Sequence, residues 1–190
     1  KIMTGKYYIK EVSPAIDLLG NVARAAGNIV FDWTPFEIPR GTACIKSIQL
    51  VMAGLNGVDV AGSRDLELYF AKSIDGVAPS SLGTSGAAIT AITSAACRRN
   101  MIGRCSFDGS AARGTVHLLG YNVWSLSGRP GNDQENHINI LEGETIYPGT
   151  TPGYQTIFVC ALADTADIDF GTGVTLNQAG HQSASDGVAV

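Results

Sequence analysis

The chain has 190 residues, of which 45% are hydrophobic and 16% charged, with a net charge of −4 and a pI near 5.3. This length and hydrophobic content support one domain with a substantial core and exclude a disordered chain. The negative charge, without a basic stripe, argues against nucleic acid as a partner. No apolar stretch approaches the roughly 18 residues that cross a bilayer, and the N-terminal residues lack the apolar core of a signal peptide, so no membrane partner is expected.

Short runs with the alternation or the apolar character of β-strands recur along the chain. In chain order they are residues 6–12, 28–36, 44–52, 65–71, 100–107, 114–124, 137–141, 145–147, 154–163, 167–170 and 174–176. We therefore predict an all-β fold, an antiparallel β-sandwich of about eight to ten short strands with long loops. A jelly-roll-like arrangement is favoured over a plain immunoglobulin-like sandwich, because long crossing loops replace uniform hairpins.

The first half of the chain holds the strands around which the sheet is expected to form. Residues 28–36 alternate until Pro35, which is expected to force the chain out of the strand. The apolar run 44–52 and the run 65–71 follow, joined by a glycine-rich turn. In the second run Leu and Phe alternate with Asp, Glu and Tyr, which predicts one buried and one exposed face.

The second half of the chain contains a predicted hairpin and a predicted central strand. The runs 100–107 and 114–124 flank an Asp108-Gly109 turn signal and are expected to pair with each other. Residues 154–163 (YQTIFVCALA) are apolar at both alternating sets of positions. This pattern predicts a strand that is covered on both faces or lies at an interface.

The domain is assigned to residues 15–176, between an N-terminal arm (1–14) and a flexible C-terminal tail (177–190) that is low in bulky residues. Residues 73–86 are small, polar and rich in glycine, and they are expected to form a long surface loop. Residues 87–96 are treated as irregular, because periodicity does not distinguish a short helix from an extended edge segment.

The four cysteines contain no CxxC pair and have no histidine at metal-ligand spacing. Cys44 and Cys160 lie in apolar strand patterns and are expected to be small buried hydrophobes. Cys97 and Cys105 flank a short segment and could be bridged across a turn. Reduced thiols, made in a cytoplasm, are favoured because the spacing is not that of a dense disulfide scaffold.

No catalytic constellation is found. His117 lies within a strand pattern, His137 follows a polar loop and His181 lies in the tail, so none has a partner suggested by spacing. GxSxG, HExxH and Walker sequences are also missing from the chain. We therefore expect a protein that is not an enzyme and needs no cofactor.

Asp164, Asp167 and Asp169 form the best candidate for a metal site, because spaced carboxylates near a glycine turn can bind calcium. They lack the rest of an EF-hand loop. The favoured interpretation is that Asp167 and Asp169 form the exposed face of a strand. A calcium-dependent adhesin domain remains a third interpretation of the chain.

Aromatic residues could provide stacking platforms for sugars, although each lies in or beside a strand, where aromatic residues are common in cores. They are Trp33, Trp124, Tyr7, Tyr8, Tyr121, Tyr147 and Tyr154. A carbohydrate-binding role requires several of them to be exposed together, which the sequence does not decide.

The runs FDWTPFEIPRGTACIKSIQLV and SRDLELYFAKSIDGVAPSSLG, within residues 28–83, resemble uncharacterised virion structural proteins of tailed bacteriophages. The resemblance implies a non-enzymatic β-sandwich on the outer surface of a capsid or tail, made in the host cytoplasm. The expected function is that of a decoration or cement protein, a homo-oligomer that binds the major capsid protein or other virion proteins. The alternative is a carbohydrate-binding or host-recognition module of a phage tail or surface adhesin.

Overall fold

The computed structural model describes residues 9–15, 25–45, 47–53, 65–89, 98–107, 116–118, 121–127 and 140–164. Within these ranges the chain is rich in strands, all paired in antiparallel fashion, and helix is confined to the short run 98–100. This agrees with the predicted all-β class. No helix of the described part is long and apolar enough to cross a membrane.

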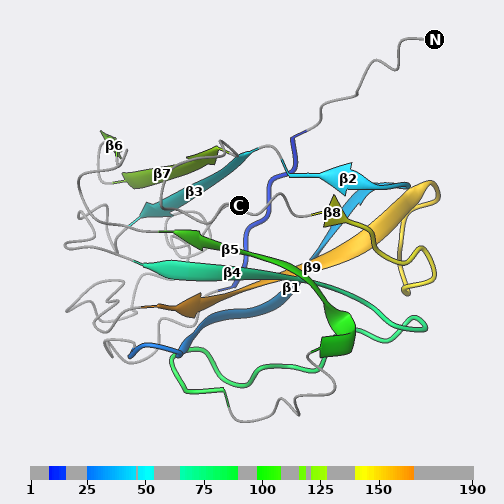
Figure 1. Ribbon diagram of the computed structural model, residues 1–190, viewed down its shortest axis with the longest axis horizontal. Coiled ribbons are helices and arrows are strands. Elements are labelled where there is room, and N and C mark those ends of the chain that lie inside the picture. Colours follow the sequence, from blue (N-terminus) through cyan, green and yellow to red (C-terminus); the bar gives the residue numbers. More distant parts are fainter. Residues whose placement is uncertain are drawn as a thin grey trace, which may run out of the picture.

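The main sheet has four antiparallel strands in the order β1-β9-β4-β5 (Figure 1). Their bounds are β1 (Ile29–Pro39), β9 (Tyr154–Ala163), β4 (Leu66–Lys72) and β5 (Met101–Phe107). The predicted central position of residues 154–163 is confirmed, because β9 pairs with β1 on one side and with β4 on the other. Its residues 155–161 are buried, as a strand covered on both faces requires.

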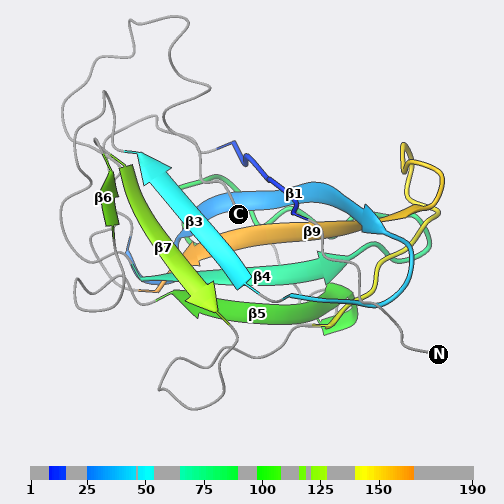
Figure 2. The ribbon, with the colours of Figure 1, turned by 90° about the horizontal axis from the view of Figure 1, so that it is seen from above.

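Two smaller sheets accompany the main one. A three-stranded sheet has the order β3-β7-β6, and a two-stranded sheet joins β2 to β8. Their bounds are β2 (Ala43–Cys44), β3 (Ser47–Ala53), β6 (Val116–Leu118), β7 (Tyr121–Ser127) and β8 (Ile140–Leu141). Figure 2 shows β3 and β7 crossing obliquely over one face of the main sheet. Ile48 of β3 is buried within the same core cluster as residues of the main sheet, so β3 shares apolar contacts with that sheet.

The larger part of the core lies on the face of the main sheet that β3 and β7 cross. It contains Leu66, Leu68 and Phe70 of β4 and the alternate residues Ile157 and Val159 of β9. The predicted alternation of β4 is confirmed, since these three β4 side chains are at most 2% exposed. Their burial supplies the hydrophobic free energy that fixes the register of β4.

The opposite face of the main sheet is covered in part by residues 78–89, which pass beneath it (Figure 1). Leu82 is 2% exposed and packs with Ile29 and Cys160. Asp32 holds the segment, because Oδ1 accepts a hydrogen bond from the Leu82 backbone N at 3.0 Å. The predicted surface loop is therefore a strap that buries one of its apolar residues against the sheet.

Strand β1 departs from its prediction in two ways. It continues through Pro35 to Pro39, because β1 is an edge strand of its sheet and a proline costs little where no ladder hydrogen bond is lost. Its simple alternation is also wrong. Register irregularities on either side of Phe31 place Phe31 in the core under β3, whereas Ile29 and Trp33 face the strap.

Several predicted pairings are wrong. The runs 44–52 and 65–71 lie in different sheets, and the first is divided into β2 and β3. The run 100–107 forms β5, which pairs with β4, whereas β6 and β7, which hold the described parts of the run 114–124, lie in another sheet. Residues 145–147 form no strand and belong to the loop between β8 and β9. Which strands pair is decided by long-range packing, and local turn signals in the sequence do not predict that packing.

Two further expectations concern side chains near the sheet margins. Cys44 is exposed, contrary to prediction. It lies in the two-residue strand β2, and the other residue of that strand, Ala43, packs against the core. Cys105 and Cys160 are buried, and Cys97 lies outside the described residues. In the predicted N-terminal arm, Val12 belongs to the core, so this part of the segment packs on the domain.

Candidate functional site

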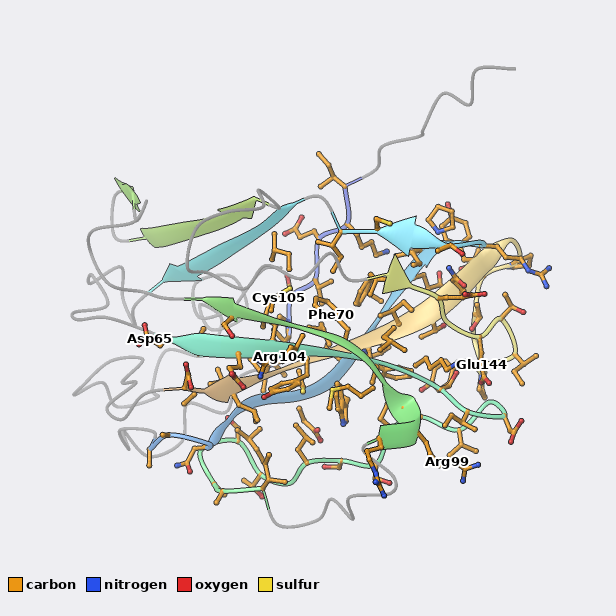
Figure 3. All side chains as sticks on the ribbon, viewed as in Figure 1. Asp65, Phe70, Arg99, Arg104, Cys105 and Glu144 are labelled. Carbon is orange, nitrogen blue, oxygen red and sulfur yellow. The ribbon has the colours of Figure 1, made fainter. Side chains whose placement is uncertain are left out.

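The most tightly organised surface is at one end of the main sheet, where two segments distant in sequence meet. We call this surface the tip and define it as the turn at residues 73–77 and the loop at residues 142–153. Both segments lie at the right-hand end of the sheet in Figure 1. Glu144 marks the tip in Figure 3, at the opposite end of the long axis from Asp65.

The first half of the tip is a tight turn at Asp75 and Gly76. Ile74 and Val77 exchange two backbone hydrogen bonds of 3.0 Å, and the two residues between them have φ of 53° and 75°. Positive φ at both central positions is typical of a type I′ turn, for which Asp-Gly is a preferred pair. This geometry leaves the backbone N–H groups of both turn residues available for an acceptor outside the turn.

Glu144 provides that acceptor. Its Oε1 accepts a hydrogen bond from the Asp75 N at 3.0 Å, and its Oε2 accepts from the Gly76 N at 3.1 Å and from Ser73 Oγ at 2.9 Å. The carboxylate thus occupies a small anion site built from two backbone amides and a buried hydroxyl. A charge-assisted hydrogen bond is stronger than a neutral one, so this contact fixes the turn against the loop.

The electrostatic state of Glu144 follows from these contacts. Burial raises the pKa of its carboxyl, but the hydrogen bonds from Gly76, Ser73 and Asp75, together with the charge of Lys72, outweigh burial and lower it below its ordinary value of 4.5. The ionised form is therefore the one that the fold stabilises.

A second carboxylate holds the other end of the loop. Glu37 of β1 accepts hydrogen bonds from the Thr151 N and from Thr151 Oγ1, each at 2.6 Å. The hydrogen bond from the Thr151 side chain has the larger effect and that from its backbone the smaller, and together they lower the pKa of Glu37 below 4.5. The charge of Lys10 lowers this pKa further. The loop at residues 142–153 is therefore anchored near each of its ends by an ionised carboxylate.

A buried amide completes the tip. The side chain of Gln155 is 2% exposed, donates from Nε2 to the carbonyl oxygens of Pro39 and Gly41, and accepts at Oε1 from the Gly143 N at 3.1 Å. It joins the end of β1 to the start of the loop. All three of its described partners are backbone groups, so this contact depends on backbone position and not on partner identity.

Apolar side chains project from this rigid frame. Val77 is 67% exposed, Ile146 is 64% exposed and Tyr154 is 40% exposed. Val77 and Ile146 belong to the two segments that Glu144 joins, and a Cβ built on Gly76 would stand 3.3 Å from the Ile146 carbonyl oxygen. The tip therefore presents apolar groups on a backbone that is already ordered.

A second candidate surface lies on the main sheet, beside the strap. Arg104 of β5 is the register partner of Tyr69 on β4, and Tyr69 shares a cluster with Trp33 of β1. The Trp33 indole Nε1 donates to the Ser80 carbonyl oxygen at 3.1 Å, which fixes the orientation of its ring. Partly exposed aromatic rings and a guanidinium thus share one face of the sheet.

Glu67 joins the polar groups of this face. It accepts a hydrogen bond from the Tyr69 hydroxyl and lies 3.8 Å from Arg104 Nη1. Burial and then the hydrogen bond and charge of Glu67 raise the pKa of Tyr69 to about 12, while Arg104 opposes the shift. The tyrosine hydroxyl is therefore neutral and has a fixed direction at physiological pH.

Of the three predicted calcium ligands, only Asp164 lies among the described residues. Asp164 is exposed after the end of β9, where desolvation and then the charges of Glu67 and Asp65 raise the pKa of its carboxyl. Asp167 and Asp169 lie outside the described residues. Within the described ranges no three histidine, cysteine or carboxylate side chains are placed to hold a metal ion.

The other predicted candidates are divided between the two surfaces and the parts that are not described. Trp33 lies on the sheet face, and Tyr147 and Tyr154 lie at or beside the tip, where the Tyr147 ring stands edge-on to Phe158 with centroids 5.2 Å apart. The remaining aromatic and histidine candidates have no described side chain: Tyr7, Tyr8, Tyr121, Trp124, His117, His137 and His181.

Sequence reasoning missed the residues that organise both surfaces. Glu37, Glu144 and Gln155 each make contacts with residues more than ten positions away, so no local pattern marks them. Tyr69 and Glu67 were assigned only to the exposed face of a strand. The one available signal was the Asp75-Gly76 pair, which is a preferred sequence for a type I′ turn.

Comparisons of the chain with protein-family models, with curated proteins and with solved structures find no match.

Proposed function

We propose that the chain is a non-enzymatic virion structural protein, a capsid decoration or cement protein that binds the outer shell and reinforces subunit contacts. The observation that carries the proposal is the tip, where Val77 and Ile146 are exposed on a frame fixed by Glu144. The resemblance of residues 28–83 to virion proteins of tailed bacteriophages supplies the identity of the partner, the major capsid protein or another virion protein.

The tip has the physical properties of a protein-docking surface. Association loses conformational entropy for every side chain and loop that must be ordered, and a loop that is ordered in advance reduces that loss. Exposed aliphatic side chains and a tyrosine provide apolar area that a partner can bury, surrounded by polar groups that can form the rim. These features favour protein contact over catalysis.

The rest of the proposal concerns architecture and assembly. The main sheet and the sheet of β3, β7 and β6 are proposed to be the two layers of a jelly-roll-like sandwich, supported by the shared burial of Ile48. The terminal segments, residues 1–14 and 177–190, are proposed to make further contacts with neighbouring copies or the shell. Repeated copies on the outer surface of the particle would form a symmetric homo-oligomer.

The test is sedimentation of the tagged chain with virus particles from its source, followed by mass spectrometry of each fraction. Co-migration at a fixed, high copy ratio to the major shell protein is the expected result. The Val77→Asp/Ile146→Asp variant should remain folded, because both positions are exposed, and should lose co-migration. Ile89→Asp, at an exposed position outside the tip, is the matched control. Wild-type protein that stays at the top of the gradient would remove the virion proposal.

Carbohydrate binding is a second candidate, favoured by the sheet face of Trp33, Tyr69 and Arg104. The ring faces of Trp and Tyr can pack on the C–H groups of a sugar, while Glu67 and Arg104 can accept and donate hydrogen bonds to its hydroxyls. The hydrogen bonds from the Trp33 indole and the Tyr69 hydroxyl orient these side chains before a ligand arrives.

A glycan array with added calcium tests this candidate. Any signal should be lost in Arg104→Ala and kept in Arg40→Ala, which removes an exposed arginine on a different part of the domain. An array without signal at high protein concentration would count against carbohydrate binding and leave the virion proposal intact.

A further inference from the structure

We propose that the loop at residues 142–153 opens in acid: the ionised carboxylates of Glu144 and Glu37 hold it closed, and it is released when both are protonated. This inference concerns the domain itself and does not depend on the proposed function. It rests on the position of the two carboxylates relative to the loop.

The two anchors hold the loop against different parts of the fold. Glu144 lies in the loop and binds the turn that follows β4, whereas Glu37 lies on β1 and binds Thr151 of the loop. At both anchors the protein groups that meet the carboxylate are hydrogen-bond donors: backbone N–H groups and the hydroxyls of Ser73 and Thr151. An ionised carboxylate has only acceptor sites, so it satisfies every one of these donors.

Protonation removes this match. A neutral carboxyl carries an O–H donor on one oxygen and is a weaker acceptor on the other. Its O–H group would then face N–H and O–H donors and leave at least one of them without an acceptor. Both anchors act on one short loop, and loss of both leaves Gln155 as its remaining described side-chain link to β1, through the Gly143 N. The loop also keeps the Thr150–Thr156 hydroxyl contact at 2.9 Å, the backbone hydrogen bonds from Thr156 N to Glu144 O and from Arg40 N to Gly153 O, and the edge-on packing of Tyr147 on Phe158. None of these contacts is charge-assisted, so the part of the loop between the anchors opens from the sheet more readily once both carboxylates are neutral.

The charged groups around the anchors favour closure at neutral pH. Lys72 of β4 faces Glu144, and Lys10 of the N-terminal segment faces Glu37, so each carboxylate has a cation from another part of the chain. Asp75, whose backbone N binds Glu144, is the acidic neighbour in the turn. The pKa of each anchor is lowered from 4.5. The two contacts therefore stabilise the closed loop fully above pH 4.5, and this stabilisation is lost as the pH falls through the lowered pKa values.

Opening would expose a specific apolar group. The Tyr147 ring of the loop packs edge-on against Phe158 of β9, which is only 2% exposed in the closed form. Release of the loop removes Tyr147 from this position. The Phe158 ring would then become accessible on this part of β9.

Amide hydrogen exchange of the full chain, from neutral pH to about pH 3 and corrected for intrinsic rates, tests the inference. We expect the protection factors of Asp75, Gly76 and Thr151 to fall by about tenfold or more at acid pH, as the loss of charge-assisted hydrogen bonds implies. The amides of β9 and β4 should stay protected, and a dye that binds exposed apolar surface should gain fluorescence.

Variants separate the two carboxylates from general acid effects. E37Q/E144Q should show the open loop at neutral pH and lose its response to acid, while each single variant should show a partial effect. E142Q removes an exposed carboxylate from the same loop and should behave as the wild type. Protected loop amides in the double variant at neutral pH would overturn the inference. So would wild-type loop amides that stay protected at acid pH, or that lose protection only together with the whole sheet.

Discussion

Glu144 accepts a hydrogen bond from the Asp75 backbone N at 3.0 Å, although 69 residues separate them in the chain. The contact exists because Asp75 adopts a left-handed conformation, with φ of 53°, that turns its N–H toward the loop. A backbone conformation in one segment thus creates the binding site for a side chain in another.

Asp75 should tolerate only residues that accept this conformation. Asp75→Val places a β-branched side chain at positive φ, and we expect it to lower the free energy of unfolding by about 1–2 kcal/mol, the usual cost of left-handed backbone. Asp75→Asn should be close to neutral, because asparagine adopts this region readily. Urea unfolding of both variants measures the difference, and equal stability would contradict the prediction.

Gly143 has no room for a side chain. A Cβ at this position would overlap the Thr156 carbonyl oxygen and stand 2.9 Å from Ile157 Cδ1. We expect Gly143→Ala to destabilise the domain by about 1–3 kcal/mol, because the backbone of the loop and β9 must separate.

The control is Gly149→Ala in the same loop, where a Cβ meets nothing within 4 Å but φ is +85°. Its cost should come from backbone strain alone, about 1 kcal/mol. Thermal or urea unfolding of the two variants compares them, and a smaller loss for Gly143→Ala than for Gly149→Ala would show that the close approach is not limiting.

Leu82 tests whether residues 78–89 are a structural strap. Its side chain is 2% exposed and packs with Ile29 and Cys160, so Leu82→Ala should cost about 2–5 kcal/mol through lost burial and a cavity. Val77→Ala, at a residue that is 67% exposed, should change stability by less than about 0.5 kcal/mol. Chemical denaturation decides the matter, and a neutral Leu82→Ala would restore the interpretation as a surface loop.

Tyr69 should ionise at unusually high pH. Its pKa is raised from 10.0 to about 12, so the fold stabilises the neutral phenol. That contribution is fully present below pH 10.0 and is lost as pH rises through about 12. The difference in tyrosinate absorbance between the wild type and Tyr69→Phe isolates this group from the other tyrosines.

The Glu67→Gln variant tests what raises the pKa of Tyr69. Burial is the largest cause of the shift and remains in this variant, whereas the charge of Glu67 is removed. We expect the pKa of Tyr69 to fall while staying above 10.0. A value that returns fully to 10.0 would mean that Glu67, and not burial, controls the ionisation.

The local sequence pattern was sufficient to predict which strand faces are buried where apolar and polar residues alternate or where a run is apolar throughout. Leu66, Leu68 and Phe70 alternate with polar residues, and a strand with one buried face follows from the two-residue period of its side chains. The run of β9 predicted a strand covered on both faces, because its residues 157–163 are apolar at both alternating sets of positions.

Tertiary structure alone decided which strands pair and which side chains meet. Strands β3 and β4 are consecutive in the chain yet lie in different sheets, since register and partner depend on the packing of whole faces. The contacts of Glu37 with Thr151 and of Glu144 with the turn join residues 114 and 69 positions apart. Their donors are largely backbone amides, which every residue except proline carries, so apart from the Asp75-Gly76 turn pair no local pattern marks them. The sequence by itself determined the strand-rich class and the central strand, and the folded chain determined the tip and its two carboxylate anchors.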